Sequence, residues 1–125
     1  MLVKKFEIYT IEMRDDGILH MHADGDHVID MRSYKVLIAG IAEMSGGKKV
    51  PILSTADDLT MPDEEVKEYF MRSKSSPYCL ANALIAPSLP QKILSNLFIN
   101  VIEPTRPIKL FKRKEDAIEW LKTFL

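Results

Sequence analysis

Polar and apolar residues alternate at the start of the chain with the period of two that is typical of half-buried β-strands. Residues 6–14 follow this pattern and predict one strand, and Asp15-Asp16-Gly17 supplies a turn in which glycine can adopt a positive φ. Residues 18–23 predict a second strand, on which His20 and His22 share one face and the apolar residues share the other. The beginning of the chain is therefore expected to form a β-hairpin.

Four later segments repeat apolar residues at intervals of three and four, which is the period of an amphipathic helix. They are residues 30–45, 60–73, 88–102 and 115–124. Asp30 is the expected N-cap of the first helix, and Gly46-Gly47 is expected to end it, because glycine readily adopts the left-handed conformation. Thr60 is the expected N-cap of the second helix, with Asp63 at the capping-box position. In the last helix the side chains expected to face the core are those of Ala117, Ile118, Leu121, Phe124 and Leu125.

Three short apolar runs lie between these helices and predict strands at residues 50–55, 78–86 and 108–111. The run 78–86 is almost continuously apolar, with Asn82 as its polar interruption, which is typical of a parallel strand covered on both faces. A hairpin followed by alternating helices and strands predicts an α/β fold with a mixed sheet of about five strands and four helices. We expect residues 1–125 to form a single domain.

Charge and cysteine content exclude several classes of protein. The chain has 17 Lys and Arg against 18 Asp and Glu, a net charge of −1, which argues against nucleic-acid binding driven by a basic excess. One cysteine, Cys79, excludes an internal disulfide framework and Cys-rich zinc sites. No segment approaches the roughly 20 apolar residues of a membrane-spanning helix, and no signal sequence is evident, so we expect a cytoplasmic protein.

Several short motifs resemble the STAS-like group, which has the SpoIIAA-like fold of sulphate-transporter and anti-sigma-factor-antagonist domains. They are Asp16-Gly17-Ile18-Leu19-His20, Ile29-Asp30, Val50-Pro51-Ile52-Leu53 before Asp57, Arg106-Pro107-Ile108-Lys109-Leu110-Phe111 and Glu115-Asp116-Ala117-Ile118-Glu119-Trp120-Leu121. The chain is most similar to stand-alone, uncharacterised bacterial members of the group. The resemblance implies a SpoIIAA-like mixed sheet and a regulatory, non-catalytic role in binding other proteins, with no cofactor.

The resemblance also implies where a regulatory switch would lie. Antagonist members carry Asp-Ser-Ser-Gly at the start of the helix after the third strand, and the second serine is phosphorylated. The corresponding residues here are Asp63, Glu64, Glu65 and Val66, so both serine positions hold glutamate. Glutamate cannot form the stable phosphate ester of serine, and we expect no phosphorylation at this helix start. The three acidic residues are instead expected to contact a partner, although not by the family's anti-sigma pairing.

Two clusters contain residue types that bind metal ions. His20 and His22 could reach one ion from a strand face, with His27, Asp24 and Asp26 nearby, but nothing in the sequence defines a third ligand. We favour a polar outer strand face over a metal site. The second cluster is acidic and comprises Asp57, Asp58, Asp63, Glu64 and Glu65. These carboxylates could bind magnesium or complement the dipole of a helix, and we favour the second role.

Catalytic residues are not grouped by any motif. Ser54, Thr55 and Ser88 are possible nucleophiles, but no Gly-x-Ser-x-Gly motif surrounds them and the histidines lie elsewhere in the chain. An enzyme is therefore the least favoured class. Cys79 is expected to be inert packing, and Asn82 to satisfy a neighbouring backbone group or line a small pocket.

The predicted third helix has more apolar residues than one inner face requires. Leu89, Ile93 and Ile99 lie beyond its apolar stripe and are expected to contact a partner or a second copy, or else to widen the core face. A lipid or small hydrophobic ligand carrier similar to Sec14 is the alternative. That carrier would need a cavity beside this helix, with Arg106 or Lys109 meeting an anionic head group.

Overall fold

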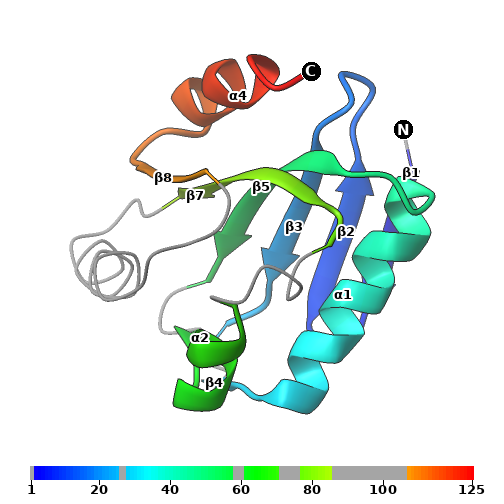
Figure 1. Cartoon of the computed structure of the whole chain (residues 1–125), viewed down its shortest axis with the longest axis vertical. Helices are drawn as coiled ribbons and strands as arrows, with labels where there is room; N and C mark the ends of the chain where they lie inside the picture. The colour runs from blue at the N-terminus through cyan, green and yellow to red at the C-terminus, as the bar shows by residue number, and fades with distance from the viewer. Residues whose placement is uncertain (1, 26–27, 58–60, 71–76, 86–106) are drawn as a thin grey trace.

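Six strands form one mixed sheet in the order β1-β2-β3-β5-β7-β8 (Figure 1). The computed structural model describes residues 2–25, 28–57, 61–70, 77–85 and 107–125. The six strands are β1 (Leu2–Phe6), β2 (Tyr9–Met13), β3 (Leu19–Ala23), β5 (Val50–Ala56), β7 (Cys79–Ile85) and β8 (Ile108–Phe111). The first three strands are antiparallel neighbours, whereas β3, β5, β7 and β8 run parallel. This is the mixed sheet that the sequence predicts.

Helices cover both faces of this sheet. They are α1 (Met31–Ser45), α2 (Glu64–Phe70) and α4 (Lys114–Lys122). Two short strands, β4 (Val28–Ile29) and β6 (Met61–Pro62), pair in parallel away from the main sheet. The expected third helix, residues 88–102, falls outside the part of the chain that the structure describes. None of the helices described is both long and apolar enough to cross a membrane.

The expected hairpin is present as β2 and β3, which pair antiparallel across the turn at Asp15-Asp16-Gly17, and β1 precedes it as a strand that was not expected. Residues 6–14 do not form one strand, because the chain reverses at Glu7 and Ile8 and separates β1 from β2. Glu7 has a φ of 55°, and its carboxylate accepts two hydrogen bonds from Arg32 at 2.8 and 3.1 Å. Because this turn contains no Gly, Asn or Asp and the alternation continues through it, the sequence pattern does not reveal it.

Helix α1 begins and ends as the sequence predicts. The Asp30 carboxylate accepts a hydrogen bond from the Ser33 N–H at 2.8 Å, so Asp30 is the N-cap. Gly46 has a φ of 68°, and the Gly47 N–H donates to the Ala42 carbonyl at 3.0 Å. These bonds satisfy the last turn of the helix and explain why it ends at the glycine pair.

Helix α2 begins later than expected, and Asp63 rather than Thr60 is its N-cap. The Asp63 carboxylate accepts a hydrogen bond from the Val66 N–H at 2.9 Å. The two residues before Asp63 belong to β6, and the Asp63 N–H donates to the Ile29 carbonyl at 3.0 Å. Pairing with β4 therefore holds the expected first turn of the helix in an extended conformation.

The strands and helix at the end of the chain agree closely with the prediction. β7 lies between β5 and β8 in parallel register, as the apolar run predicts. Ala117 and Leu121 of α4 are fully buried. Leu125, which was expected to point inward, is 64% exposed, since α4 ends three residues before it.

The core consists of two apolar clusters on opposite faces of the sheet. On one face α1 and α2 pack over a cluster that includes Tyr9, Ile11, Leu19, Leu37 and Val66. On the other face α4 packs over Ile18, Leu53, Ala81 and Ala83. The alternation of side chains along each strand assigns every polar residue of the sheet to one of these faces.

Candidate functional site

A cluster of polar side chains lies on the α4 face of the sheet, towards the carboxyl ends of β3 and β5. His20 and His22 follow Leu19, whose side chain packs on the α1 face, in strict alternation. His22 is opposite Thr55 in the parallel ladder, and His20 is opposite Leu53 of the α4-face cluster. The two histidines and Thr55 therefore share one face, at the end of the sheet where ligands of parallel α/β proteins usually bind.

These side chains form one continuous hydrogen-bonded chain. The Thr55 Oγ1 atom lies 2.8 Å from His20 Nε2 and 2.6 Å from His22 Nδ1. The other nitrogen of His22, Nε2, lies 3.0 Å from Asp57 Oδ1. A carboxylate can only accept, so His22 donates to Asp57 and its Nδ1 accepts the Thr55 hydroxyl proton, while His20 donates to the Thr55 oxygen. This assignment satisfies every hydrogen bond in the chain.

Burial keeps His20 in the neutral form. Loss of solvation, with smaller electrostatic contributions from Lys114, His22 and Arg14, lowers the pKa of His20 to about 4. The ring therefore serves as a neutral hydrogen-bonding group at neutral pH.

Protonation of His20 is expected to destabilise the fold in mild acid. Because folding lowers its pKa from 6.5 to about 4, the unfolded chain binds a proton between these pH values that the folded chain does not. Stability should rise with pH across this range and be lost as the pH falls through it. The ring is partly open to solvent, whose screening reduces the expected loss to about 1–2 kcal/mol.

Urea unfolding of the metal-free protein at pH 7.0 and 4.5 measures this loss. The variant His20→Gln, which keeps a hydrogen-bonding side chain but does not titrate, should show a smaller decrease than the wild type. Equal decreases in the two proteins would show that His20 does not cause the acid sensitivity.

Two carboxylates complete a potential metal-binding group around His22. One ligand atom each from His22, Asp24 and Asp57 lies within 4.8 Å of the other two. The sequence pattern favoured a polar strand face because it defined no third ligand beside the histidines. The structure brings Asp57 next to His22 because β5 pairs with β3. Asp26, His27 and Asp58 of the expected clusters lie outside the described residues.

The same cluster corrects the expectation that no nucleophile, base and acid can be grouped. Thr55 is hydrogen-bonded to His22, and His22 is hydrogen-bonded to Asp57, although 35 positions of the chain separate His22 from Asp57. Strand pairing, and not a local motif, creates this arrangement. Ser88 lies beyond the described part of the chain, and Ser54 points to the opposite face.

Two buried residues of the central strands are structural. The Ser54 hydroxyl donates to Asn82 Oδ1 at 2.7 Å, which gives the polar residue of this apolar strand a side-chain partner. Cys79 is buried in the cluster under α1, consistent with the expected packing role.

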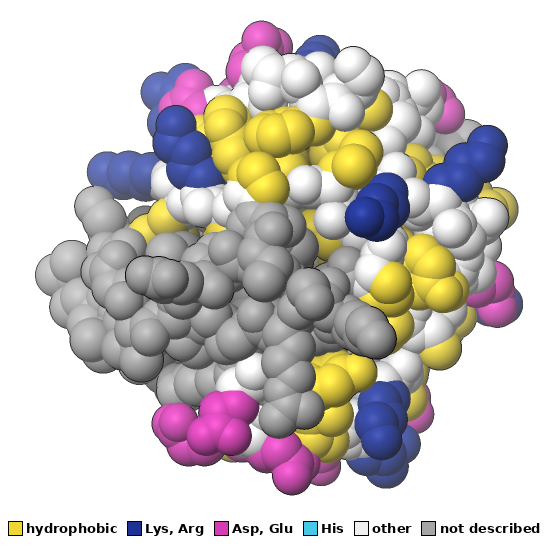
Figure 2. Space-filling model, in the orientation of Figure 1, with side chains coloured by type: hydrophobic (Ala, Val, Ile, Leu, Met, Phe, Trp, Pro, Cys, Tyr) yellow, Lys and Arg dark blue, Asp and Glu magenta, His cyan; other side chains and the backbone are white. Residues whose placement is uncertain are grey.

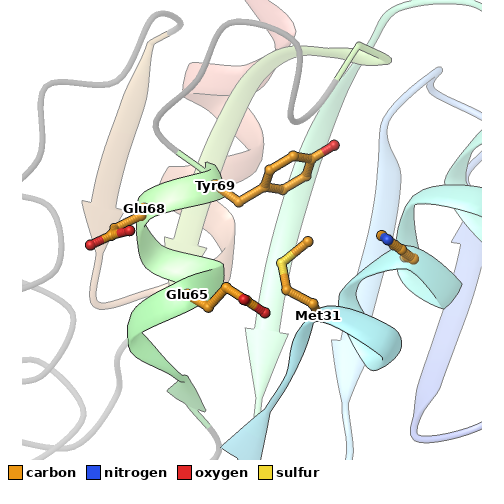
Figure 3. Close-up of a pocket in the computed structure, with 5 residues that line it drawn as sticks. Met31, Glu65, Glu68 and Tyr69 are labelled. Carbon is orange, nitrogen blue, oxygen red and sulfur yellow. The ribbon is translucent and has the colours of Figure 1, made fainter.

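A second site is an open groove between α1 and α2 on the other face of the sheet. It has a volume of about 370 Å³ and is lined by Met31, Lys35, Glu65, Glu68 and Tyr69. Figure 3 shows the Glu65 carboxylate and the Met31 side chain pointing towards each other from the two helices. Tyr69 extends above them, and its ring packs edge-on against Tyr34 with 5.9 Å between centroids. The lining therefore combines apolar side chains, Met31 and Tyr69, with charged ones.

The acidic start of α2 forms one side of this groove. Asp63 is the N-cap, and Glu64 and Glu65 lie exposed in the first turn. In Figure 2 acidic side chains lie over α2, and a hydrophobic strip separates them from basic side chains over the start of α1. The carboxylates also favour helix formation, because they lie at the positive end of the helix dipole.

The other expected contact residues stay predictions. Leu89, Ile93, Ile99 and Arg106 lie outside the residues that the structure describes. Lys109 is exposed on β8, and its Nζ lies 5.3 Å from the centroid of the Phe111 ring. Its expected contact with an anion is compatible with this position.

One protein family has a sequence profile that matches residues 11–125, from β2 to Leu125. The chain belongs to the DUF7793 family. This family is described as a domain of unknown function. Its match includes both candidate sites, since all residues of the histidine cluster and of the groove lie within 11–125.

A solved structure shows the same fold as this DUF7793 chain. It is the crystal structure of an uncharacterised protein of the DUF3478 family from Shewanella loihica PV-4, described as having a SpoIIAA-like fold. The two chains share 19% sequence identity with a TM-score of 0.55, over 90% of this chain and 91% of that chain. The expected SpoIIAA-like fold is confirmed. The comparison with curated proteins gives no match.

Proposed function

We propose that this DUF7793 chain is a non-catalytic interaction domain of the STAS-like type, which binds a partner protein in the groove between α1 and α2. The groove carries the proposal because it lies at the helix start that STAS-like antagonists use as their switch. Its lining includes charges of both signs, Lys35 from α1 and Glu65 and Glu68 from α2. The partner segment that suits it has a basic side chain next to an apolar one.

The start of α2 supports binding that does not depend on phosphorylation. Glu64 and Glu65 place carboxyl groups at the two positions where antagonist members have serine. A partner that recognises these groups would bind constitutively, without the on and off states of a phosphoserine. Rim charges of this kind contribute mainly to partner choice and association rate.

The groove is less suited to a lipid carrier. Three of its five lining side chains are charged, and burying an acyl chain against carboxylates is unfavourable. A carrier would instead need the cavity beside the predicted third helix. Pairing with a second copy through Leu89, Ile93 and Ile99 is compatible with the groove-binding role, since it uses other residues.

Cross-linking in living cells tests the groove directly. A photoreactive phenylalanine at Glu68, which is exposed and lines the groove, is expected to capture one discrete protein when the chain is expressed in its native cells. The same group at Glu119, exposed on α4, is the control and should capture little. Phosphatase treatment should leave the adduct unchanged.

A charge-reversal variant provides the decisive comparison. Glu65→Lys is expected to reduce the adduct about tenfold, because it places like charges opposite the basic partner segment. Circular dichroism should show that the variant is folded. Equal capture from positions 68 and 119, or capture that Glu65→Lys does not change, would contradict the proposal.

A further inference from the structure

The histidine cluster lies on the sheet face opposite the groove, and the proposed interaction does not use it. Its three potential ligands come from three different places in the fold. His22 is on β3, Asp24 follows β3, and Asp57 follows β5. One imidazole nitrogen and two carboxylate oxygens form a donor set that suits zinc and similar first-row metal ions.

The backbone around each ligand is held by hydrogen bonds. The Asp24 N–H donates to the Ile8 carbonyl at 2.8 Å, which ties it to the turn between β1 and β2. The Asp57 N–H donates to the Ala23 carbonyl at 3.0 Å and so extends the ladder between β3 and β5 by one residue. His22 lies inside that ladder, opposite Thr55. The three ligands therefore start from defined backbone positions.

A small movement of the side chains brings the donors to coordination distance. Ligand atoms at about 2.0–2.2 Å from zinc lie roughly 3.4 Å apart in a tetrahedral site, against the present maximum of 4.8 Å. The side chains of His22, Asp24 and Asp57 are 33%, 39% and 54% exposed, so rotation of the two carboxylates is not blocked by burial. The same exposure leaves space for water as a further ligand.

The rest of the hydrogen-bonded chain supplies the support that a metal-binding histidine needs. When His22 Nε2 binds a metal, the ring carries its proton on Nδ1 and donates it to Thr55 Oγ1. The Thr55 hydroxyl then donates to His20 Nε2, so all three side chains keep their hydrogen bonds with their directions reversed. Only the hydrogen bond between His22 Nε2 and Asp57 is given up, and the ion would then join these two groups.

We propose that His22, Asp24 and Asp57 bind one divalent first-row transition-metal ion, with Thr55 holding the His22 ring in position. Zinc is the appropriate probe, because the single imidazole and two carboxylates suit it better than the all-oxygen sites that Mg²⁺ and Ca²⁺ prefer. The site joins β3 to the segment after β5, so the bound ion stabilises the carboxyl edge of the sheet.

Lys5 has an opposing effect that makes the proposal testable. Its ammonium group forms an ion pair with Asp24, and both side chains are partly exposed. A cation at the metal position would be repelled by this charge, and the lysine must move aside. Removal of the charge should therefore strengthen metal binding.

Zinc titration of the whole chain in a non-chelating buffer is the experiment. Calorimetry is expected to show one ion per chain, and ¹H–¹⁵N spectra should show the His22 Nε2 resonance moving on addition of zinc. Asp57→Asn and His22→Ala should each lower the affinity at least about tenfold. Mg²⁺ and Ca²⁺ at the same concentration should not move the His22 resonance.

Two further variants separate binding from simple loss of folding. Lys5→Gln should raise the zinc affinity about three- to tenfold, and a misfolded protein cannot produce such a gain. Lys4→Gln is the matched control, because Lys4 is an equally exposed neighbour that pairs with Glu43 instead, and its affinity should match the wild type. Thr55→Val should weaken binding about tenfold, and Thr55→Ser should restore it.

Three outcomes would overturn the proposal. They are no zinc binding by the folded wild type, zinc binding that His22→Ala leaves unchanged, and an affinity that Lys5→Gln does not raise. None of them bears on the groove between α1 and α2, which is tested separately by cross-linking.

Discussion

Replacement of Leu53 by alanine is expected to lower the free energy of unfolding by about 2–5 kcal/mol. Leu53 is fully buried on β5, which lies between β3 and β7 in the middle of the sheet. It belongs to the cluster that attaches α4, together with Ala117 and Leu121. Loss of its side chain leaves a cavity, and neighbouring alanines are too short to fill it.

Urea unfolding at pH 7 followed by circular dichroism measures this loss. Leu80→Ala on the adjacent strand β7 is the matched control, because the same atoms are removed from a side chain that is 37% exposed. The free energy of unfolding should fall well under half as much in the control as in Leu53→Ala, since less apolar surface returns to water. Similar losses in the two variants would show that the α4-face cluster is not tightly packed.

Replacement of Gly40 by valine is the second large effect that we expect, with a loss of about 1–3 kcal/mol. Gly40 is buried on α1 where the helix packs against β1 and β2. A Cβ atom at this position would lie 2.9 Å from Ile11 Cδ1 and 3.1 Å from the Phe6 ring. Valine adds two further methyl groups, so α1 would have to move away from β1 and β2.

Ala39→Val controls for placing a valine in α1, since the helix propensity of valine is lower than that of alanine but higher than that of glycine. Ala39 is the neighbouring residue on α1 and is exposed, so the substitution there changes propensity without creating a clash. Thermal unfolding should place Ala39→Val within about 0.7 kcal/mol of the wild type. If Gly40→Val is no less stable than this control, the close approach of α1 to β1 and β2 does not limit stability.

The elements that the sequence predicts well are those with local signals. Helix α1 has a capping carboxylate at Asp30 and a glycine pair at its end, and both make the expected bonds. The turn at Glu7 has no such signal. The Glu7 carboxylate pairs instead with the guanidinium of Arg32, 25 positions later. The extra strand of the hairpin could not be predicted for that reason.

The start of α2 shows a conflict between a local and a distant interaction. Thr60 followed by Met61 and Pro62 is a reasonable helix start when only local sequence is considered. Pairing of β6 with β4 extends the chain here and moves the start to Asp63. The acidic residues of the first turn are therefore where the sequence predicts them, although the helix is shorter.

The two candidate sites were predictable to different degrees. Glu65 was expected at a partner surface from its position in the motif, but the groove requires Met31 and Lys35 of α1, which no pattern connects to it. His20 and His22 were expected on one face. Their partners Thr55 and Asp57 are brought to them only by the register between β3 and β5.

The amino-acid sequence by itself determined the α/β class, the period and approximate limits of the described helices, and the faces on which the side chains of β2 and β3 lie. These properties depend on neighbours within a few positions, through side-chain alternation, helical spacing and capping. Only the tertiary structure decided that Thr55, His22 and Asp57 form one hydrogen-bonded chain and that α1 and α2 enclose a groove. Such contacts depend on strand register and helix packing between distant residues, which local spacing does not encode.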